Sequence, residues 1–266
     1  MGLGVGASGF DGERVALIAS QRARPYSAGD LSAAARDLAA WRCAGLGVHT
    51  VLDDSYPDRL RDVPSLPPVL FTRGIVRPDD HAVAVVGARH ASSLGLSFAA
   101  DLATALVGLG VTVVSGLAAG IDTAAHAAAL ASGGRTVAVL GTGVGRCYPP
   151  SNRDLQSEIA RRGLLLSQFW PDTPPREHNF VTRNAVLCGY ADACVIAEAG
   201  ESSSTRTLAR HALDQSRPLI LTTLVLRSAA WAKSLTRRAG VHIASSVDET
   251  LAAIAEGRAA AERTFA

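Results

Sequence analysis

Glycine and small polar residues cluster where several short apolar runs of this chain end. Gly116 and Gly120 follow one such run, and Gly143 follows the next. Glycine lets a ligand approach the backbone closely, and a helix that begins after such a turn presents free N–H groups and the positive end of its dipole. This combination binds anions, most often phosphate. The phosphate-binding residues that these loops predict are Gly87, Arg89, Ser115, Gly116, Gly120, Gly141, Gly143, Glu198, Gly200 and Ser202.

Arginines lie in or just after the same loops. They are Arg89, Arg146, Arg153, Arg183 and Arg206. A guanidinium group can hold a phosphate through two parallel hydrogen bonds, so these side chains would complete an anion site. The alternative is that the glycines serve only tight strand-to-helix turns and that each arginine is a solvated surface residue. Several such loops at one edge favour the binding site, because ligands of open α/β sheets bind outside the carboxyl ends of the strands.

Two nucleotide-binding motifs do not occur in the sequence. The run from Gly141 to Gly145 lacks the third glycine of GxGxxG, because Arg146 occupies that position. Neither GxxxxGKS nor GxxxxGKT occurs, which argues against ATP hydrolysis by a P-loop.

Ser115, Asp122 and His126 could suggest a hydrolytic triad. However, Asp122 and His126 are four residues apart at a predicted helix start, so Asp122 is interpreted as the N-cap with His126 one turn later. The serine also lacks the GxSxG nucleophile elbow. Glu198 could be a catalytic carboxylate or a ribose ligand, or it could hold a neighbouring side chain in place. We favour the structural role for Glu198.

Short apolar runs alternate with helical patterns from residue 82 onward. The predicted strands are 82–86, 111–115, 136–140, 164–167, 193–197 and 218–224. The predicted helices are 97–109, 123–131, 152–161, 181–189 and 205–215. A weaker unit follows, with a helix over 231–238, a strand over 241–245 and a helix from Asp248. The alternation predicts an α/β fold with a doubly wound, mostly parallel sheet that is covered on both faces.

The first 75 residues depart from this pattern. A helix is predicted over 30–46 and a short strand over 48–52, while residues 1–25 look poorly specified and partly disordered. We therefore expect a small N-terminal helical and irregular segment over 1–75, the α/β core over 76–257 and a C-terminal tail over 258–266.

The composition of the chain restricts which ligands it can bind and which cellular compartment it is expected to occupy. The 266 residues are 48% hydrophobic with a net charge of +2, so a large core can form but a nucleic-acid ligand would need local clustering of charge. The cysteines have neither CxxC nor zinc-ligand spacing, so no metal is predicted, and Cys188 and Cys194 are expected to be buried thiols. With no recognisable signal peptide or membrane-spanning stretch, we expect a cytoplasmic protein with no membrane partner.

Several motifs, in one order, resemble the bacterial DNA-processing protein A family. The residues that carry the resemblance are Val85-Val86-Gly87-Ala88-Arg89, Ser115-Gly116-Leu117-Ala118-Ala119-Gly120-Ile121-Asp122, Val139-Leu140-Gly141-Thr142-Gly143, Tyr148-Pro149-Pro150-Ser151-Asn152, Phe180-Val181-Thr182-Arg183-Asn184 and Glu198-Ala199-Gly200. With Tyr56-Pro57-Asp58-Arg59-Leu60 upstream, the resemblance extends over approximately residues 50–250.

The resemblance implies a Rossmann-like core that binds single-stranded DNA, without ordinary catalysis and without a cofactor. Members of that family protect incoming single strands and help load the RecA recombinase during natural transformation, so competence and DNA recombination are the implied processes. They also dimerise through the core. Single-stranded DNA, RecA recombinase and a second copy of the chain are therefore the expected partners. The resemblance supports Arg89 and adds Asn152, Arg183 and Asn184 to the predicted DNA-binding residues.

The chain departs from the family pattern in the second half of this site. The family's Arg-Asn-Arg motif reads Arg183-Asn184-Ala185, and its Ser-Glu after the fourth strand reads Ser167-Gln168. Each lost phosphate contact weakens the salt-dependent part of binding. The chain is therefore expected to be a divergent or trimmed member.

Two other functions of the same superfamily remain open. A nucleotide-binding sensor would use the same strand-end loops, and a phosphoribohydrolase-like enzyme would use Glu198 as its acid. The Pro-Gly-Gly-x-Gly-Thr-x-x-Glu loop of that enzyme group does not occur in this sequence, which argues against the enzyme. The expected function is single-stranded DNA binding in DNA processing, uptake and recombination.

Overall fold

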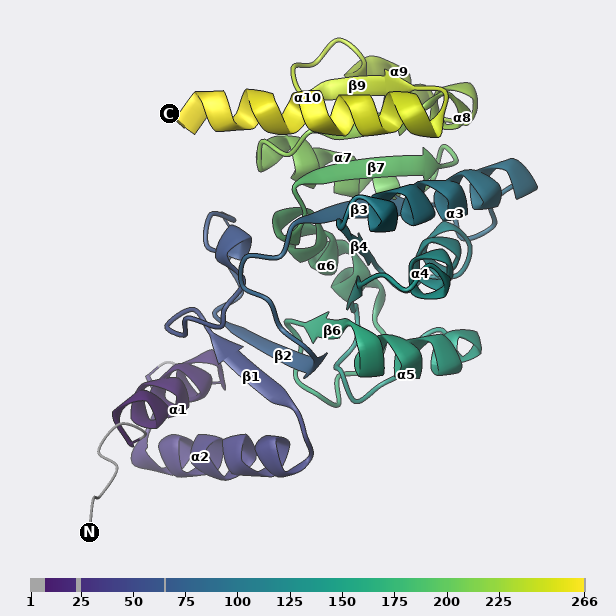
Figure 1. Ribbon diagram of the computed structural model, residues 1–266. Helices are drawn as coiled ribbons and strands as arrows, with labels where there is room; N and C mark the ends of the chain where they lie inside the picture. The colour runs from purple at the N-terminus through teal and green to yellow at the C-terminus, as the bar shows by residue number, and fades with distance from the viewer. Residues whose placement is uncertain (1–7, 23–24, 65, 266) are drawn as a thin grey trace.

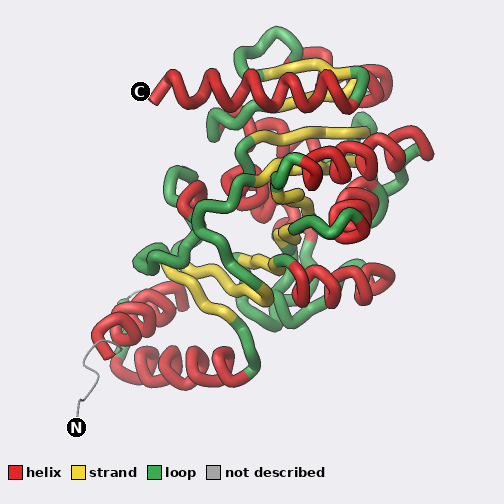
Figure 2. The backbone as a smooth tube through the Cα atoms, in the orientation of Figure 1, coloured by secondary structure: helices red, strands yellow, loops and turns green. Residues whose placement is uncertain are grey.

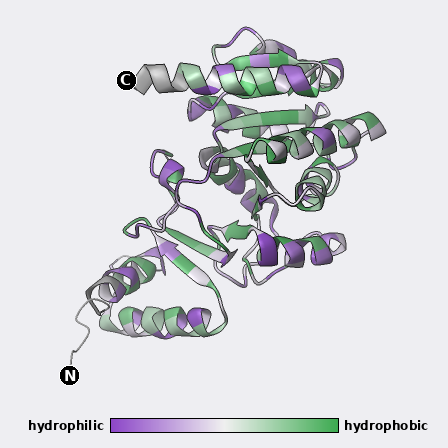
Figure 3. Ribbon diagram, viewed as in Figure 1, coloured by the Kyte–Doolittle hydropathy of each residue, from purple (hydrophilic) through white to green (hydrophobic). Residues whose placement is uncertain are grey.

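The core strands are apolar on both faces and lie between two layers of helices. In β3 (Ala82–Gly87), Val83 and Val85 pack on one side of the sheet, whereas Ala84 and Val86 pack on the other. A parallel sheet with helices on both sides requires strands of this kind, and the central strands are coloured as hydrophobic in Figure 3. The computed structural model describes residues 8–22, 25–64 and 66–265. It confirms the predicted doubly wound α/β fold.

Nine strands of the described residues form one sheet. Besides β3, they are β1 (Gly47–Thr50), β2 (Val69–Gly74), β4 (Thr112–Ser115), β5 (Thr136–Val139), β6 (Leu164–Ser167), β7 (Ala193–Glu198), β8 (Leu219–Thr222) and β9 (Val241–Ala244). Their spatial order is β1-β2-β6-β5-β4-β3-β7-β8-β9; β1 and β2 pair antiparallel with their neighbours, and the remaining pairs are parallel. Strands β4, β5 and β6 are therefore added one after another on one side of β3, and the next strand in the chain, β7, pairs with the other side of β3. Such a reversal opens a crevice at the carboxyl ends of the two strands.

Helices cover both faces of this sheet (Figures 1 and 2). They are α1 (Ser8–Arg22), α2 (Ala28–Cys43), α3 (Ser93–Gly108), α4 (Ile121–Ala131), α5 (Arg153–Arg162), α6 (Glu177–Tyr190), α7 (Thr205–Asp214), α8 (Thr223–Ser228), α9 (Ala230–Leu235) and α10 (Val247–Phe265), with 3-10 turns η1 (Asp58–Leu60) and η2 (Pro150–Asn152). Helices α3, α4 and α10 supply apolar side chains to one face, and α6, α7 and α8 to the other. None of these described helices is both long enough and apolar enough to span a bilayer.

Most predicted core elements are confirmed within a few residues, with one error in the strand predicted over 218–224. That strand ends at Thr222, and α8 begins at Thr223. The Thr222 hydroxyl accepts a hydrogen bond from the Val225 amide at 3.4 Å and so caps the helix. The apolar residues of α8 directly follow those of β8 in the sequence, so the hydrophobic pattern does not show where the strand ends. Only the capping residue Thr222 indicates that a helix begins there.

The N-terminal region is more ordered than predicted. Residues 8–22 form α1, where the sequence predicts partial disorder; residues 1–7 and 23–24 of that prediction lie outside the described residues. Ile18 is fully buried in the cluster that also contains Leu38 of α2, and Arg14 forms an ion pair with Asp53 at 2.6 Å. Packing of an apolar face stabilises a short helix that would be marginal alone. Since β1 and β2 join the sheet, residues 47–74 share it with the core strands.

His126 on α4 is fully buried and neutral. Its Nδ1 lies 2.7 Å from Thr136 Oγ1, which itself donates to the carbonyl oxygen of Val113, so the network assigns the proton to Nδ1. No hydrogen-bond partner within the described part of the chain meets Nε2. Burial lowers the pKa of His126 from 6.5 to about 3.

We expect His126 to make the fold sensitive to acid. The unfolded chain binds a proton near pH 6.5 and the folded chain only near pH 3, so the free energy of unfolding falls as the pH drops through this interval. Between about pH 7 and about pH 5 the loss from this residue is about 2 kcal/mol. Urea unfolding of His126→Gln should show a pH dependence that is smaller by that amount, with exposed His178→Gln as the control. An equal pH dependence in wild type and His126→Gln would contradict the assignment.

Candidate functional site

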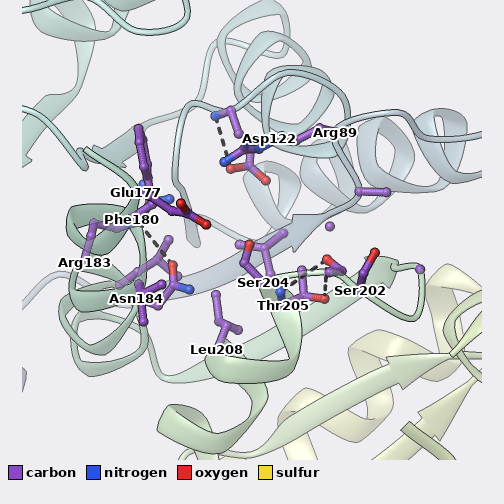
Figure 4. A pocket seen from close by; sticks show the side chains of 18 of the residues that line it. Arg89, Asp122, Glu177, Phe180, Arg183, Asn184, Ser202, Ser204, Thr205 and Leu208 are labelled. Carbon is purple, nitrogen blue, oxygen red and sulfur yellow. Dashed lines mark hydrogen bonds between the residues drawn. The ribbon is translucent and has the colours of Figure 1, made fainter. Parts of the chain in front are cut away.

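A cavity of about 710 Å³ lies in the crevice where the sheet reverses direction between β3 and β7. Its walls come from the turn after β3, the loop after β4, the first turns of α6 and the turn between β7 and α7 (Figure 4). Six of the thirteen predicted site residues line it: Gly87, Arg89, Arg183, Asn184, Gly200 and Ser202. Seven lie outside its lining: Ser115, Gly116, Gly120, Gly141, Gly143, Asn152 and Glu198.

Arg89 is the exposed cation of the cavity. Its guanidinium carbon lies 5.7 Å from the centre of the Phe180 ring, which in turn lies 5.4 Å from the Tyr148 ring. Both aromatic residues line the cavity, and Arg89 takes part in no ion pair among the described residues. The site therefore presents a positive charge beside an aromatic surface. Phe180 was not among the predicted site residues, although it immediately precedes the Val181-Thr182-Arg183-Asn184 part of the recognised motif.

Arg183 is buried beneath the cavity, with 6% of the residue exposed. Its Nη1 donates to the carbonyl oxygen of Gly116 at 2.8 Å and to that of Val139, and its Nε donates to Asn184 Oδ1 at 3.3 Å. These bonds tie the carboxyl ends of β4 and β5 to α6. Gly116 is required for this contact, because a Cβ there would overlap the guanidinium group. Arg183 thus forms part of the floor of the cavity.

Asp122 does not cap α4, contrary to the sequence interpretation. Gly120 precedes the helix at φ 80°, and Asp122 Oδ2 accepts hydrogen bonds from the amides of Gly116 at 3.1 Å and Ala118 at 3.3 Å. The carboxylate therefore satisfies amide groups that the sequence assigned to a phosphate. Burial raises the pKa of Asp122, and the nearby Arg183 charge opposes that shift.

The rejection of a hydrolytic triad is confirmed. Ser115 Oγ donates to the carbonyl oxygen of Val85 at 2.6 Å, and His126 Nδ1 bonds Thr136 instead. Ser115 and His126 are therefore not hydrogen-bonded to each other, as the nucleophile and base of a triad would be.

The glycines after β5 serve close packing against the loop after β6. The Gly143 amide donates to the carbonyl oxygen of Thr173 at 3.0 Å, and a Cβ at Gly143 would overlap the carbonyl oxygens of Trp170 and Pro171. A Cβ at Gly141 would overlap the Phe180 ring. At these two positions the structure agrees with the alternative that the glycines serve tight packing.

Asn152 and Glu198 position neighbouring loops. The Asn152 amide donates to the carbonyl oxygen of Leu117 at 3.0 Å, which holds that residue at φ 59°. The Glu198 carboxylate accepts from the Ser92 amide and hydroxyl at 3.0 and 2.8 Å, where α3 begins. Glu198 therefore has the structural environment that the sequence interpretation favoured.

Two carboxylates line the cavity: Glu177, which is exposed at the start of α6, and the buried Asp122. The hydroxyl residues Ser202 and Ser204 lie opposite, at the start of α7 (Figure 4). Within the part of the chain that the structure describes, no three His, Cys, Asp or Glu side chains are grouped so that they could hold a metal ion. The groups that line the cavity are therefore hydroxyls, amides, aromatic rings, the imidazole of His90, two carboxylates and the guanidinium groups of Arg89 and Arg183.

Comparison with known sequences places most of the chain in one family. The family model described as DNA recombination-mediator protein A matches residues 47–254. Protein Smf from Synechocystis sp. is 40% identical over 173 residues, which cover 62% of this chain and 43% of that protein. The DNA processing protein DprA of Streptococcus pneumoniae is 38% identical over 171 residues, which cover 63% of this chain and 60% of that protein. The chain thus spans about half the length of these curated relatives.

Solved structures share the same architecture. DNA processing protein A from Streptococcus pneumoniae superimposes with a TM-score of 0.72 at 30% identity, over 84% of this chain and 81% of that chain. DNA processing protein A from Helicobacter pylori, whose structure concerns its single-stranded DNA binding mode, gives a TM-score of 0.69 at 23% identity, over 79% of this chain and 96% of that chain. The second comparison bears on the fold alone.

Proposed function

This chain belongs to the DNA recombination-mediator protein A family, and we propose that it binds single-stranded DNA at the cavity between β3 and β7. The observation that carries the proposal is the exposed Arg89 guanidinium beside the Phe180 ring at this crevice. A cation that contacts phosphate and an aromatic face that stacks on a base are the two elements of sequence-independent single-strand binding.

The exposed charge of Arg89 favours an anion at its side of the cavity. Burial is the largest cause that lowers the pKa of the Arg183 guanidinium; the Asp122 charge opposes this shift, and repulsion by the Arg89 charge adds to it. A phosphate near Arg89 would relieve this repulsion. In this proposal Arg89 contacts the backbone of the strand, while Arg183 shapes the floor and adds positive potential.

The proposed cellular role is DNA processing during natural transformation, with delivery of the bound strand to the RecA recombinase. The Streptococcus pneumoniae relative, named as a DNA processing protein, supports this role. We also propose that the chain acts as a homodimer. The edge strand β9, where Ile243 is 49% exposed, offers one contact surface, and analytical ultracentrifugation tests the dimer.

We propose binding without catalysis. A phosphoribohydrolase-like reaction would use the Glu198 carboxylate. In the structure this carboxylate accepts hydrogen bonds from Ser92, and Glu198 is not among the residues that line the cavity. Incubation with nucleoside monophosphates should therefore release no free base, and release of base would contradict this part of the proposal.

Arg89→Ala is expected to weaken binding of oligo-dT by about tenfold at moderate salt, because one phosphate contact is lost. The slope of log affinity against log salt concentration should also fall by about 0.7. Fluorescence anisotropy at several salt concentrations measures both quantities. Arg238→Ala is the matched control, since Arg238 is exposed and lies outside the cavity lining. Equal affinity and slope in Arg89→Ala and wild type would remove Arg89 from the site.

A further inference from the structure

A second cavity, of about 570 Å³, lies directly beside the first. The two cavities share Val181, which is 40% exposed at the start of α6. On the same two helical turns, Phe180 and Arg183 line the first cavity, whereas Thr182 and Ala185 line the second. The start of α6 therefore lies between the first and the second cavity.

The second cavity has the surface chemistry of a nucleobase site. Phe169, in the loop after β6, lines it, and among the described residues its ring forms no ring contact. The neighbouring Trp170 is already engaged, because it stacks on Trp41 at 5.6 Å and lies under the Arg22 guanidinium at 4.9 Å. The Phe169 ring is therefore the aromatic surface of this cavity that remains for a ligand.

Polar groups that could contact the edge of a base line the same cavity. Gln168 precedes Phe169, and Thr182 and His211 line the cavity from α6 and α7. No acidic side chain occurs among the described residues that line the second cavity, so nothing there repels a phosphodiester chain.

We propose that the second cavity holds another base of the same DNA strand, stacked on Phe169, while the first base lies against Phe180. This inference rests on the proposed function and extends it, because it makes the site a two-base groove that runs across the start of α6. The occupant is single-stranded DNA and not a peptide, because the cavity adjoins the proposed DNA site at Val181 and combines an unstacked ring with uncharged hydrogen-bonding groups.

Oligonucleotide length separates the two cavities experimentally. Phe169→Leu keeps the apolar volume and removes the aromatic face. We expect it to weaken binding of an oligo-dT of about twelve nucleotides by about tenfold and to leave binding of the single nucleotide dTMP nearly unchanged, because only a strand with more than one base fills both cavities. Phe180→Leu, the matched variant in the first cavity, should weaken binding of both.

Cross-linking of the wild-type protein provides a test that no substitution can disturb. Oligo-dT that carries 5-iodouracil should cross-link to Phe169 when it is about twelve nucleotides long, as mapped by mass spectrometry. If Phe169→Leu binds both ligands like wild type and no cross-link reaches residues 168–170, the second cavity is not a DNA site, whereas the effect of Phe180→Leu would still support the first. If neither variant changes binding, the proposed function itself fails.

Discussion

Replacement of Arg183 by methionine is expected to destabilise the fold by about 3–5 kcal/mol, the usual cost of removing one member of a buried charged network. The guanidinium donates to the carbonyl oxygens of Gly116 and Val139 and lies close to the Asp122 charge. Methionine has similar length but no donor, so the two carbonyl groups lose this partner and Asp122 loses its compensating charge. Urea unfolding at neutral pH measures the loss.

Two further variants separate this structural role from a direct phosphate contact. Arg183→Lys keeps the positive charge but cannot reproduce the planar fork of donors, so it should lie between wild type and Arg183→Met in stability. Arg206→Met, an exposed arginine outside the cavity lining, should unfold like wild type. If Arg183→Met unfolded at the wild-type urea concentration but lost DNA affinity, Arg183 would be a phosphate ligand and not part of the floor.

Gly143→Ala is expected to destabilise the fold by about 2–3 kcal/mol, as overpacking of a rigid site does. The added Cβ would overlap the carbonyl oxygens of Trp170 and Pro171, and backbone atoms cannot rotate away as a side chain can. The loop after β6 would have to move, and Phe169 with it. Binding of the longer oligo-dT should therefore fall together with stability.

Gly200→Ala is the control for this experiment. Gly200 also follows a strand and lines the first cavity, but a Cβ there meets nothing within 4 Å. Its stability should stay within about 0.5 kcal/mol of wild type. Equal unfolding midpoints for Gly143→Ala and Gly200→Ala would mean that the loop after β6 is not fixed by Gly143.

The sequence predicts the sheet well, because the apolar runs of its parallel strands are buried on both faces and alternate with helices. It also predicts the edge of the sheet at which the cavity forms, since glycine and hydroxyl residues follow β3 and β7. The antiparallel strand β2 is harder to place, because its partner β6 is far away in the chain, and β1 joins the sheet only through β2.

The roles of individual residues were less predictable, because they depend on how α6 packs. Arg89 and Arg183 are the same residue type, so the sequence alone does not distinguish their roles. In the structure the Arg89 side chain is exposed, whereas Arg183 donates hydrogen bonds to backbone carbonyl groups. Phe180 faces the cavity only because α6 begins at Glu177 and turns that side inward. Asp122 was misplaced because its loop, and not the helix, supplies the amides that it accepts.

The neighbouring positions of β3 and β7 have a consequence for synthesis on the ribosome. The two strands that flank the first cavity are separated in the chain by β4, β5, β6 and α6, so the crevice cannot close until β7 has left the exit tunnel. Domains assemble from the N-terminus as they are made, and pairings between distant segments come last. A nascent chain that ends before β7 would therefore have Arg89 but no groove, and it would gain its ligand only near the end of translation.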